Sequence, residues 1–63
     1  MTTKDFLLMT IQAQNPCSYR YLIQQCQFHG FTRGMVQAFN ELKHEGLIYV
    51  SEDDDNALIV DLA

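Results

Sequence analysis

The sequence predicts an α+β fold in which three helices are followed by a C-terminal β-hairpin. Three observations support this prediction. Apolar residues recur at helical spacing in three successive segments of the chain. Each of these segments is followed by a proline or a glycine, residues that commonly end helices. Two runs rich in β-forming residues come last, and a polar loop separates them.

The length of the chain limits what it can do. Its 63 residues are enough for one domain, residues 1–63, with a modest core. A hydrophobic fraction of 48% and a charged fraction of 19% are those of a globular protein and exclude a disordered one. We find no nucleophile–base pair, phosphate-binding loop or metal motif. The sequence therefore predicts a protein that is not an enzyme, with no cofactor and no metal site.

The cellular location is predicted from two features that the sequence lacks, a membrane-spanning run and a secretion signal. No apolar run reaches the length of a membrane span, and the stretch Phe6–Met9 is too short for a secretion signal. We therefore expect a cytoplasmic protein without membrane contact. Cys17 and Cys26 are interpreted as reduced, partly buried thiols. The spacing of Cys26 and His29 is that of a zinc-ligand pair, but the second pair of a zinc site is missing.

The first helix is predicted over residues 3–14. Thr2 or Thr3 is expected to cap it, and Asp5 lies in the first turn, where its charge suits the helix dipole. Asn15-Pro16 ends the helix, because the residue before a proline disfavours helical geometry. The apolar face is expected to contain Phe6, Leu7, Met9 and Ala13.

The second helix is predicted over residues 18–26, with Ser18 as its N-cap. Leu22, Ile23 and Cys26 form a narrow inward stripe at helical spacing. We expect the helix to stop in the segment Gln27–Gly30, and Gly30 to turn the chain in the left-handed conformation.

The third helix is predicted over residues 32–45, with Thr32 as its N-cap and Gly46 directly after its end. Lys43 and His44 lie in the last turn, where positive charge is favourable. The residues expected to point inward are Met35, Val36, Phe39 and Leu42.

The hairpin is predicted to have strands at residues 47–51 and 57–62. Leu58, Val60 and Leu62 are expected to share one face of the second strand, with Asp61 on the other. The loop contains the acidic block Glu52–Asp55, which accounts for the net charge of -4. The remaining 59 residues carry four acidic and four basic side chains.

The order helix, helix, turn, helix, hairpin resembles the winged helix-turn-helix superfamily. The most similar segment is Thr32–Ile48, in which a valine is followed by an apolar residue three positions later and a leucine three further on. Gly46-Leu47-Ile48 then leads into the hairpin, as in small bacterial or phage regulators. The segment Tyr21–Cys26 resembles the positioning helix of the same motif. The resemblance covers nearly the whole chain and implies a three-helix winged helix-turn-helix with a C-terminal β-hairpin wing, without assigning a specific family.

The resemblance implies a small DNA-binding transcriptional regulator that reads double-stranded DNA with its third helix. The early turns of such a helix contact base edges in the major groove. One unit of this size offers few phosphate contacts, so a homodimer or a protein partner is expected. The solvated face of an ordinary amphipathic helix carries the same residue types, and the pattern alone does not separate the two interpretations. The candidate DNA-binding residues are Thr32, Arg33, Gln37 and Asn40 at base edges, with Lys43 and His44 near phosphate.

The charge supports an alternative function. DNA-binding proteins usually carry a positive surface, because neutralising phosphates supplies much of their affinity, whereas this chain is negative. Winged helices also act as protein-interaction modules, since a fold does not determine a function. In this alternative, the chain is a modulator or assembly subunit that binds a protein partner and not DNA. The candidate contact residues are Glu52, Asp53, Asp54 and Asp55 in the acidic loop, with Tyr19 and Phe28.

Overall fold

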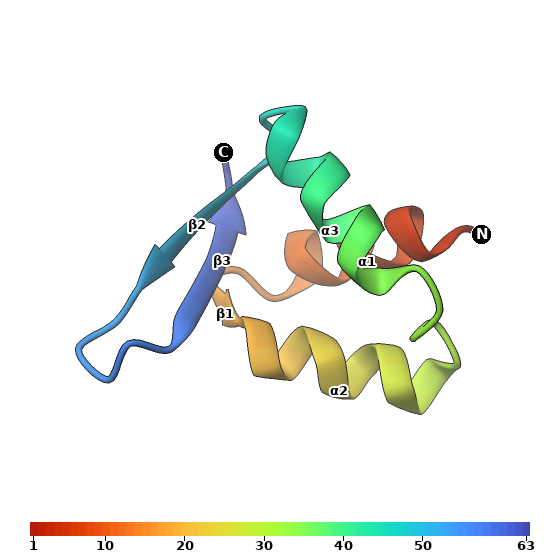
Figure 1. Ribbon diagram of the computed structural model, residues 1–63, viewed down its shortest axis with the longest axis horizontal. Coiled ribbons are helices and arrows are strands. Elements are labelled where there is room, and N and C mark those ends of the chain that lie inside the picture. The colour runs from red at the N-terminus through yellow and green to blue at the C-terminus, as the bar shows by residue number, and fades with distance from the viewer.

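The computed structural model describes all 63 residues and confirms the predicted α+β fold. Three helices and a three-stranded antiparallel sheet make up the structure (Figure 1). The arrangement is compatible with a winged helix. The elements in chain order are α1 (Thr3–Ala13), β1 (Cys17–Ser18), α2 (Tyr19–His29), α3 (Met35–His44), β2 (Ile48–Glu52) and β3 (Leu58–Leu62).

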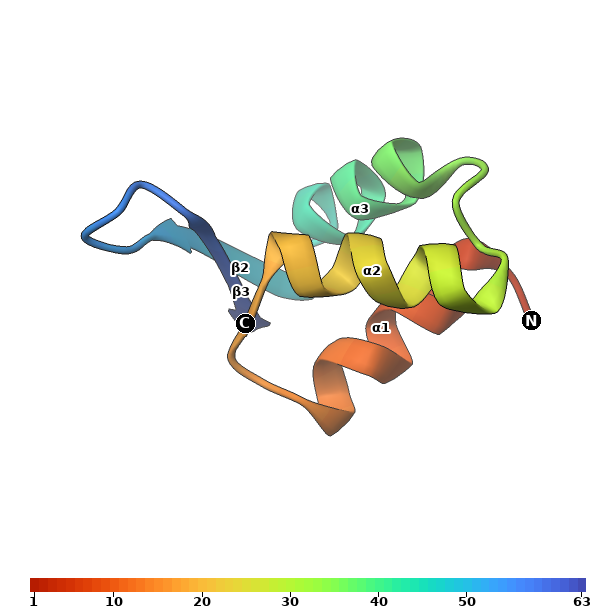
Figure 2. The same ribbon diagram turned by 90° about the horizontal axis from the view of Figure 1, so that it is seen from below.

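The sheet has the order β1-β3-β2, so β3 lies in the centre and β2 forms one edge. Both neighbours run antiparallel to β3, with Val60 opposite Val50 on one side and opposite Cys17 on the other. Figures 1 and 2 show the β2–β3 hairpin extending beyond the helices as a wing. Its strands agree with the prediction to within one residue. Strand β1 was not predicted, because two residues that lead directly into a helix are too few for an alternating pattern.

Helix α1 begins as predicted but buries a different face. Thr2 and Asp5 form a capping box, in which the Asp5 N–H donates to Thr2 Oγ1 at 3.1 Å and the Thr2 N–H donates to Asp5 Oδ2 at 3.3 Å. Leu7 and Ile11 are fully buried. The expectation for Met9 and Ala13 was wrong, since both are exposed. Each comes two residues after a core residue and so points about 200° away from it around the helix.

Helix α2 has the predicted caps and is longer than predicted. Ser18 is the N-cap and accepts a hydrogen bond from the Tyr21 N–H at 3.0 Å. Gly30 ends the helix in the left-handed conformation, with φ at 78°. The three residues before Gly30 are helical, so the helix ends at His29 and not at residue 26, the last residue of the predicted helix. Phe28 therefore lies on a helix and not in a turn.

Helix α3 begins at Met35, three residues later than predicted, and the assignment of Thr32 as its N-cap was wrong. Gly34 is the N-cap residue, with φ at 76°, a conformation that a threonine adopts only with strain. The inward position predicted for Val36 was also wrong, because its side chain is 64% exposed. The buried residues follow the spacing i, i+3, i+4 and i+7, namely Met35, Ala38, Phe39 and Leu42.

One hydrophobic core joins all three helices and the sheet. Its fully enclosed side chains are Leu7, Ile11, Leu22, Cys26, Leu42 and Val60. Cys17 and Cys26 are free and buried, as predicted, and burial raises the pKa of both thiols. The thiols are therefore protonated at neutral pH. Each helix, at ten or eleven residues, is too short to cross a membrane.

Candidate nucleic-acid interface

The outward face of α3 is polar and uncharged at its centre. Gln37, Asn40 and His44 are exposed and recur every three or four residues, on the side of the helix opposite Leu42. They line an open surface hollow of about 750 Å³, together with Val36, Glu41 and Glu45. Because no hydrogen bond within the chain uses the two amide side chains, their donors and acceptors are free for a ligand.

Thr32 and Arg33 lie in the turn before α3 and not on the helix itself. Both are exposed, and Arg33 makes no ion pair. The Thr3 hydroxyl donates to the Arg33 carbonyl oxygen at 3.1 Å, which ties this turn to the start of α1. Arg33 therefore lies in a backbone segment that is held in place, directly before the start of α3.

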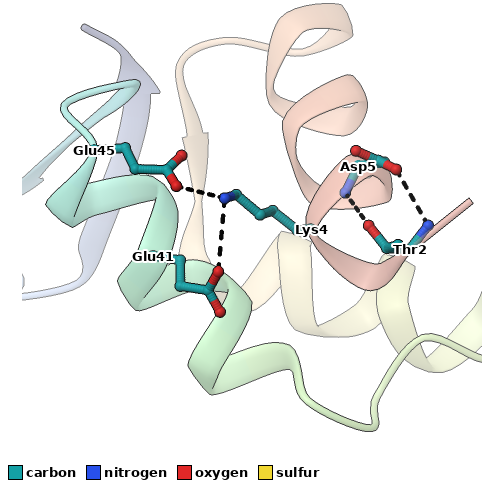
Figure 3. Close-up of polar contacts among 5 residues, drawn as sticks. All are labelled: Thr2, Lys4, Asp5, Glu41 and Glu45. Carbon is teal, nitrogen blue, oxygen red and sulfur yellow. Dashed lines mark hydrogen bonds and ion pairs between the residues drawn. The ribbon is translucent and has the colours of Figure 1, made fainter.

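Two carboxylates lie at the edge of α3 that faces α1, and Lys4 contacts both of them (Figure 3). Lys4 Nζ lies 2.6 Å from Glu45 Oε2 and 3.6 Å from Glu41 Oε1. The hydrogen bond to Glu45 raises the pKa of Lys4, and both negative charges add to the effect. Lys4 thus cancels one of the two negative charges beside the polar face of α3.

The two residues predicted to lie near phosphate occupy different sides of α3. His44 lies on the outward face with Gln37 and Asn40. Lys43 lies on the side of the wing, where it lines a second hollow with β2 and Leu58. Lys43 makes no ion pair within the chain, so its charge is free for a partner.

The acidic wing tip contains one structural carboxylate and three free ones. Asp53 Oδ1 accepts hydrogen bonds from the N–H groups of Asp55 and Ala57, both at 2.9 Å. The Asn56 N–H donates to the Asp53 carbonyl oxygen at 3.0 Å, and Asn56 closes the turn with φ at 62°. Asp53 thus holds the turn, as an aspartate at the first position of a turn commonly does. The other carboxylates, those of Glu52, Asp54 and Asp55, are exposed and make no ion pair.

The aromatic residues of the alternative function do not come together. Tyr19 and Phe28 lie at opposite ends of α2, about 14 Å apart along a helix that rises 1.5 Å per residue. Tyr19 is half-buried and packs edge-on against Phe39, with ring centroids 4.8 Å apart. Phe28 is 82% exposed and contacts only the His29 ring among the aromatic groups, at 5.0 Å. The predicted protein-contact residues therefore occupy three separate places, and Phe28 is the one with a free apolar surface.

Two features of the site were missed by the sequence reasoning. Val36 belongs to the outward face, and its apolar character concealed this, because the same residue type fills the core. Lys4 comes from a helix more than thirty residues earlier, and no local pattern connects it with Glu41 and Glu45. No three histidine, cysteine, aspartate or glutamate side chains lie where they could hold a metal ion together. No family model, curated protein or solved structure matches this sequence.

Proposed function

We propose that the chain is a small DNA-binding transcriptional regulator of the winged helix-turn-helix type, which acts in the cytoplasm and places α3 in the major groove of double-stranded DNA. The observation that carries the proposal is the outward face of α3. Its exposed amide side chains have no structural role, and Lys4 reduces the negative charge beside them. A binding role requires no catalytic group, so the proposed regulator is not an enzyme.

The chemistry of the outward face fits base edges. The amides of Gln37 and Asn40 are of the type that forms paired hydrogen bonds with adenine N6 and N7, and Arg33 can pair with guanine O6 and N7. Val36 offers an apolar contact for a thymine methyl group. Since Gln37 and Asn40 lie one helical turn apart, they address neighbouring base pairs when α3 lies in the groove.

The charge distribution implies weak binding by a single copy. Arg33 and Lys43 are the unpaired cations near the two ends of α3, and the acidic wing tip repels phosphate. Because each phosphate contact adds to the salt dependence, a site with so few cations has a shallow slope of affinity against salt. The regulator therefore depends on base contacts, or on a second copy, for useful affinity.

The test is a selection of binding sites from a random duplex library, followed by affinity measurements at about 50 mM and about 200 mM salt. The variants Gln37→Ala and Asn40→Ala should each weaken binding to the selected site by about tenfold or more and relax the preference at one base pair. Arg33→Ala should lower the salt slope by about one if Arg33 contacts a phosphate, or relax one base preference if it contacts guanine.

The matched controls are Gln24→Ala and Gln27→Ala, which remove exposed glutamines from α2. Neither should change the affinity or the base preference. The proposal is overturned if no duplex binds at low salt, or if the α3 variants bind as the wild type does.

A second candidate function, a protein-interaction module without DNA binding, is favoured by the exposure of Phe28. Exposed aromatic residues are enriched among those that dominate protein interfaces. Two variants test the two candidate surfaces independently. Phe28→Ser alters the end of α2, and the double change of Asp54 and Asp55 to serine alters the wing tip while leaving the structural Asp53 intact. Loss of a captured protein on Phe28→Ser, measured by quantitative mass spectrometry, supports this function. Equal capture by the wild type and both variants would show that neither Phe28 nor the acidic wing tip contacts the captured protein.

A further inference from the structure

Strand β2 forms an unprotected edge of the sheet. Its only strand neighbour is β3, and the strand lies along the outer side of the wing (Figure 1). Proteins commonly protect such an edge with proline, lysine or a β-bulge, because its free backbone groups can bind another strand. Ile48–Glu52 contains neither proline nor lysine and pairs with β3 without a break in register. The edge can therefore accept a further strand.

Two hydrogen bonds show which way the backbone groups of β2 point. The Ala63 N–H donates to the Leu47 carbonyl oxygen at 3.2 Å, and the Asp53 N–H donates to the Ala57 carbonyl oxygen at 3.0 Å. These bonds flank the β2–β3 pairing at its two ends. In an antiparallel pair, hydrogen-bonded positions alternate with positions that are not bonded. Odd-numbered residues of β2 therefore bond to β3, and even-numbered residues turn their N–H and C=O groups outward.

The outward-facing positions of β2 are symmetric about Val50. Ile48 and Glu52 lie two residues to either side of it, and all three direct free donors and acceptors away from β3. We propose that this edge pairs with the same edge of a second copy of the chain, antiparallel, with Val50 of both copies at the two-fold axis. Ile48 then faces Glu52 of the other copy, and every outward backbone group of β2 gains a partner. This self-complementary arrangement is the kind that two-fold dimers use.

Charge complementarity favours a second copy as the occupant. Lys43 and Glu52 line one surface hollow with Ile48, yet they form no ion pair within the chain. When Ile48 faces the Glu52 of the other copy, Lys43 lies near that carboxylate, and the symmetry repeats the contact. Antiparallel pairing also places the two acidic wing tips at opposite ends of the interface, so that they do not repel each other.

The opposite face of the sheet adds a side-chain contact. Tyr49 is 62% exposed, and the proposed register brings it opposite Ser51 of the other copy at a position that is not hydrogen-bonded, where side chains approach closely. A five-residue edge buries less surface than a standard protein interface, and interfaces of that class are weak. The dimer is therefore expected to have a Kd on the order of 100 μM. The proposal does not depend on DNA binding.

Sedimentation equilibrium over about 10 μM to about 1 mM chain tests the proposal. The average mass of the wild type should rise from 7.3 kDa toward twice that value as concentration increases. Lys43→Glu and Glu52→Lys should each weaken association by about tenfold, since each turns two symmetric attractions into repulsions. The double variant that exchanges both charges should associate as the wild type does.

Val50→Pro tests the backbone pairing itself, because the Val50 N–H points outward and no bond to β3 depends on it. This variant should remain folded by circular dichroism and lose association. Gln27→Ala, near the C-terminal end of α2, should associate normally. A wild type that stays monomeric at the highest concentration, a failure of the charge exchange to restore association, or loss of association on Gln27→Ala overturns the proposal.

Discussion

Helix α3 and the wing follow one another in the chain but use their polar residues in different ways. Helix α3 buries four of its ten residues, so packing holds it, and the amide side chains of Gln37 and Asn40 take no part in the fold. The wing buries only Ile48 and Val60 in its two strands, and its turn depends on the side chain of Asp53. One acidic residue of the wing is thus structural, whereas the amides of α3 are free.

This difference shows why residue type alone does not identify a functional surface. The acidic block Glu52–Asp55 is the most conspicuous charge feature of the sequence, yet one of its members is explained by turn geometry. Gln37 and Asn40 are inconspicuous in the sequence, yet the fold leaves both of them without an internal partner. A conspicuous charge therefore does not by itself mark a binding surface, because a carboxylate can be part of the fold.

The largest expected effect concerns the packing of α3. Leu42→Ala removes a fully buried side chain and should lower the free energy of unfolding by about 2–5 kcal/mol, as measured by urea denaturation. Val36→Ala on the same helix should change it by less than about 0.5 kcal/mol, because Val36 is 64% exposed. A comparable loss of stability for both variants would contradict the observed orientation of α3, in which Leu42 faces the core and Val36 faces outward.

The next effect concerns the turn of the wing. Asp53→Ala leaves two backbone N–H groups without their acceptor and should lower the free energy of unfolding by about 1 kcal/mol. Asp54→Ala is the matched control, since the neighbouring carboxylate makes no hydrogen bond within the chain and its loss should have no measurable effect. Thermal and urea unfolding of the two variants measure the difference. Equal stability would show that Asp53 does not hold the turn.

A smaller effect links the wing to the proposed DNA binding. Changing Asp54 and Asp55 to asparagine removes two exposed negative charges without altering the side-chain shape. Affinity for duplex DNA should rise a few-fold at low salt, and the gain should disappear at high salt, because exposed charges are screened. Equal affinity of variant and wild type at low salt would mean that the wing tip lies away from bound DNA.

The smallest effect concerns the contact between α1 and α3. The pKa of Lys4 is raised in the folded chain, so its contribution is present below the ordinary lysine pKa of 10.5 and is lost as the pH rises through the folded value. Lys4→Met should therefore be less stable than the wild type at pH 7, by a small margin, and the two should converge at strongly alkaline pH. Urea denaturation of both proteins across pH 7–12 measures this. A difference that does not change with pH would contradict the electrostatic explanation.

Local sequence signals predicted the order and type of the large elements. The capping box of Thr2 and Asp5, the N-cap Ser18 and the left-handed Gly30 were each predictable, because caps depend on residues within a single turn. The start of α3 was not, since Thr32 is a good local cap by residue type, whereas the helix begins after Gly34, whose φ is 76°. Strand β1 exists only because β3 returns beside it.

The residues of the candidate site also fall into those that local sequence patterns predicted and those that only the packing of the elements revealed. The sequence by itself determined that the third helix carries Gln37, Asn40 and His44 on a polar side, because helical periodicity separates them from Leu42. Only the tertiary structure decided that Val36 joins that side, that Lys4 neutralises part of its charged edge and that Lys43 belongs to the hollow beside β2. Periodicity acts over one or two helical turns, whereas these contacts join elements that are distant in the chain. Such contacts depend on how the helices and the sheet pack together, which no local pattern encodes.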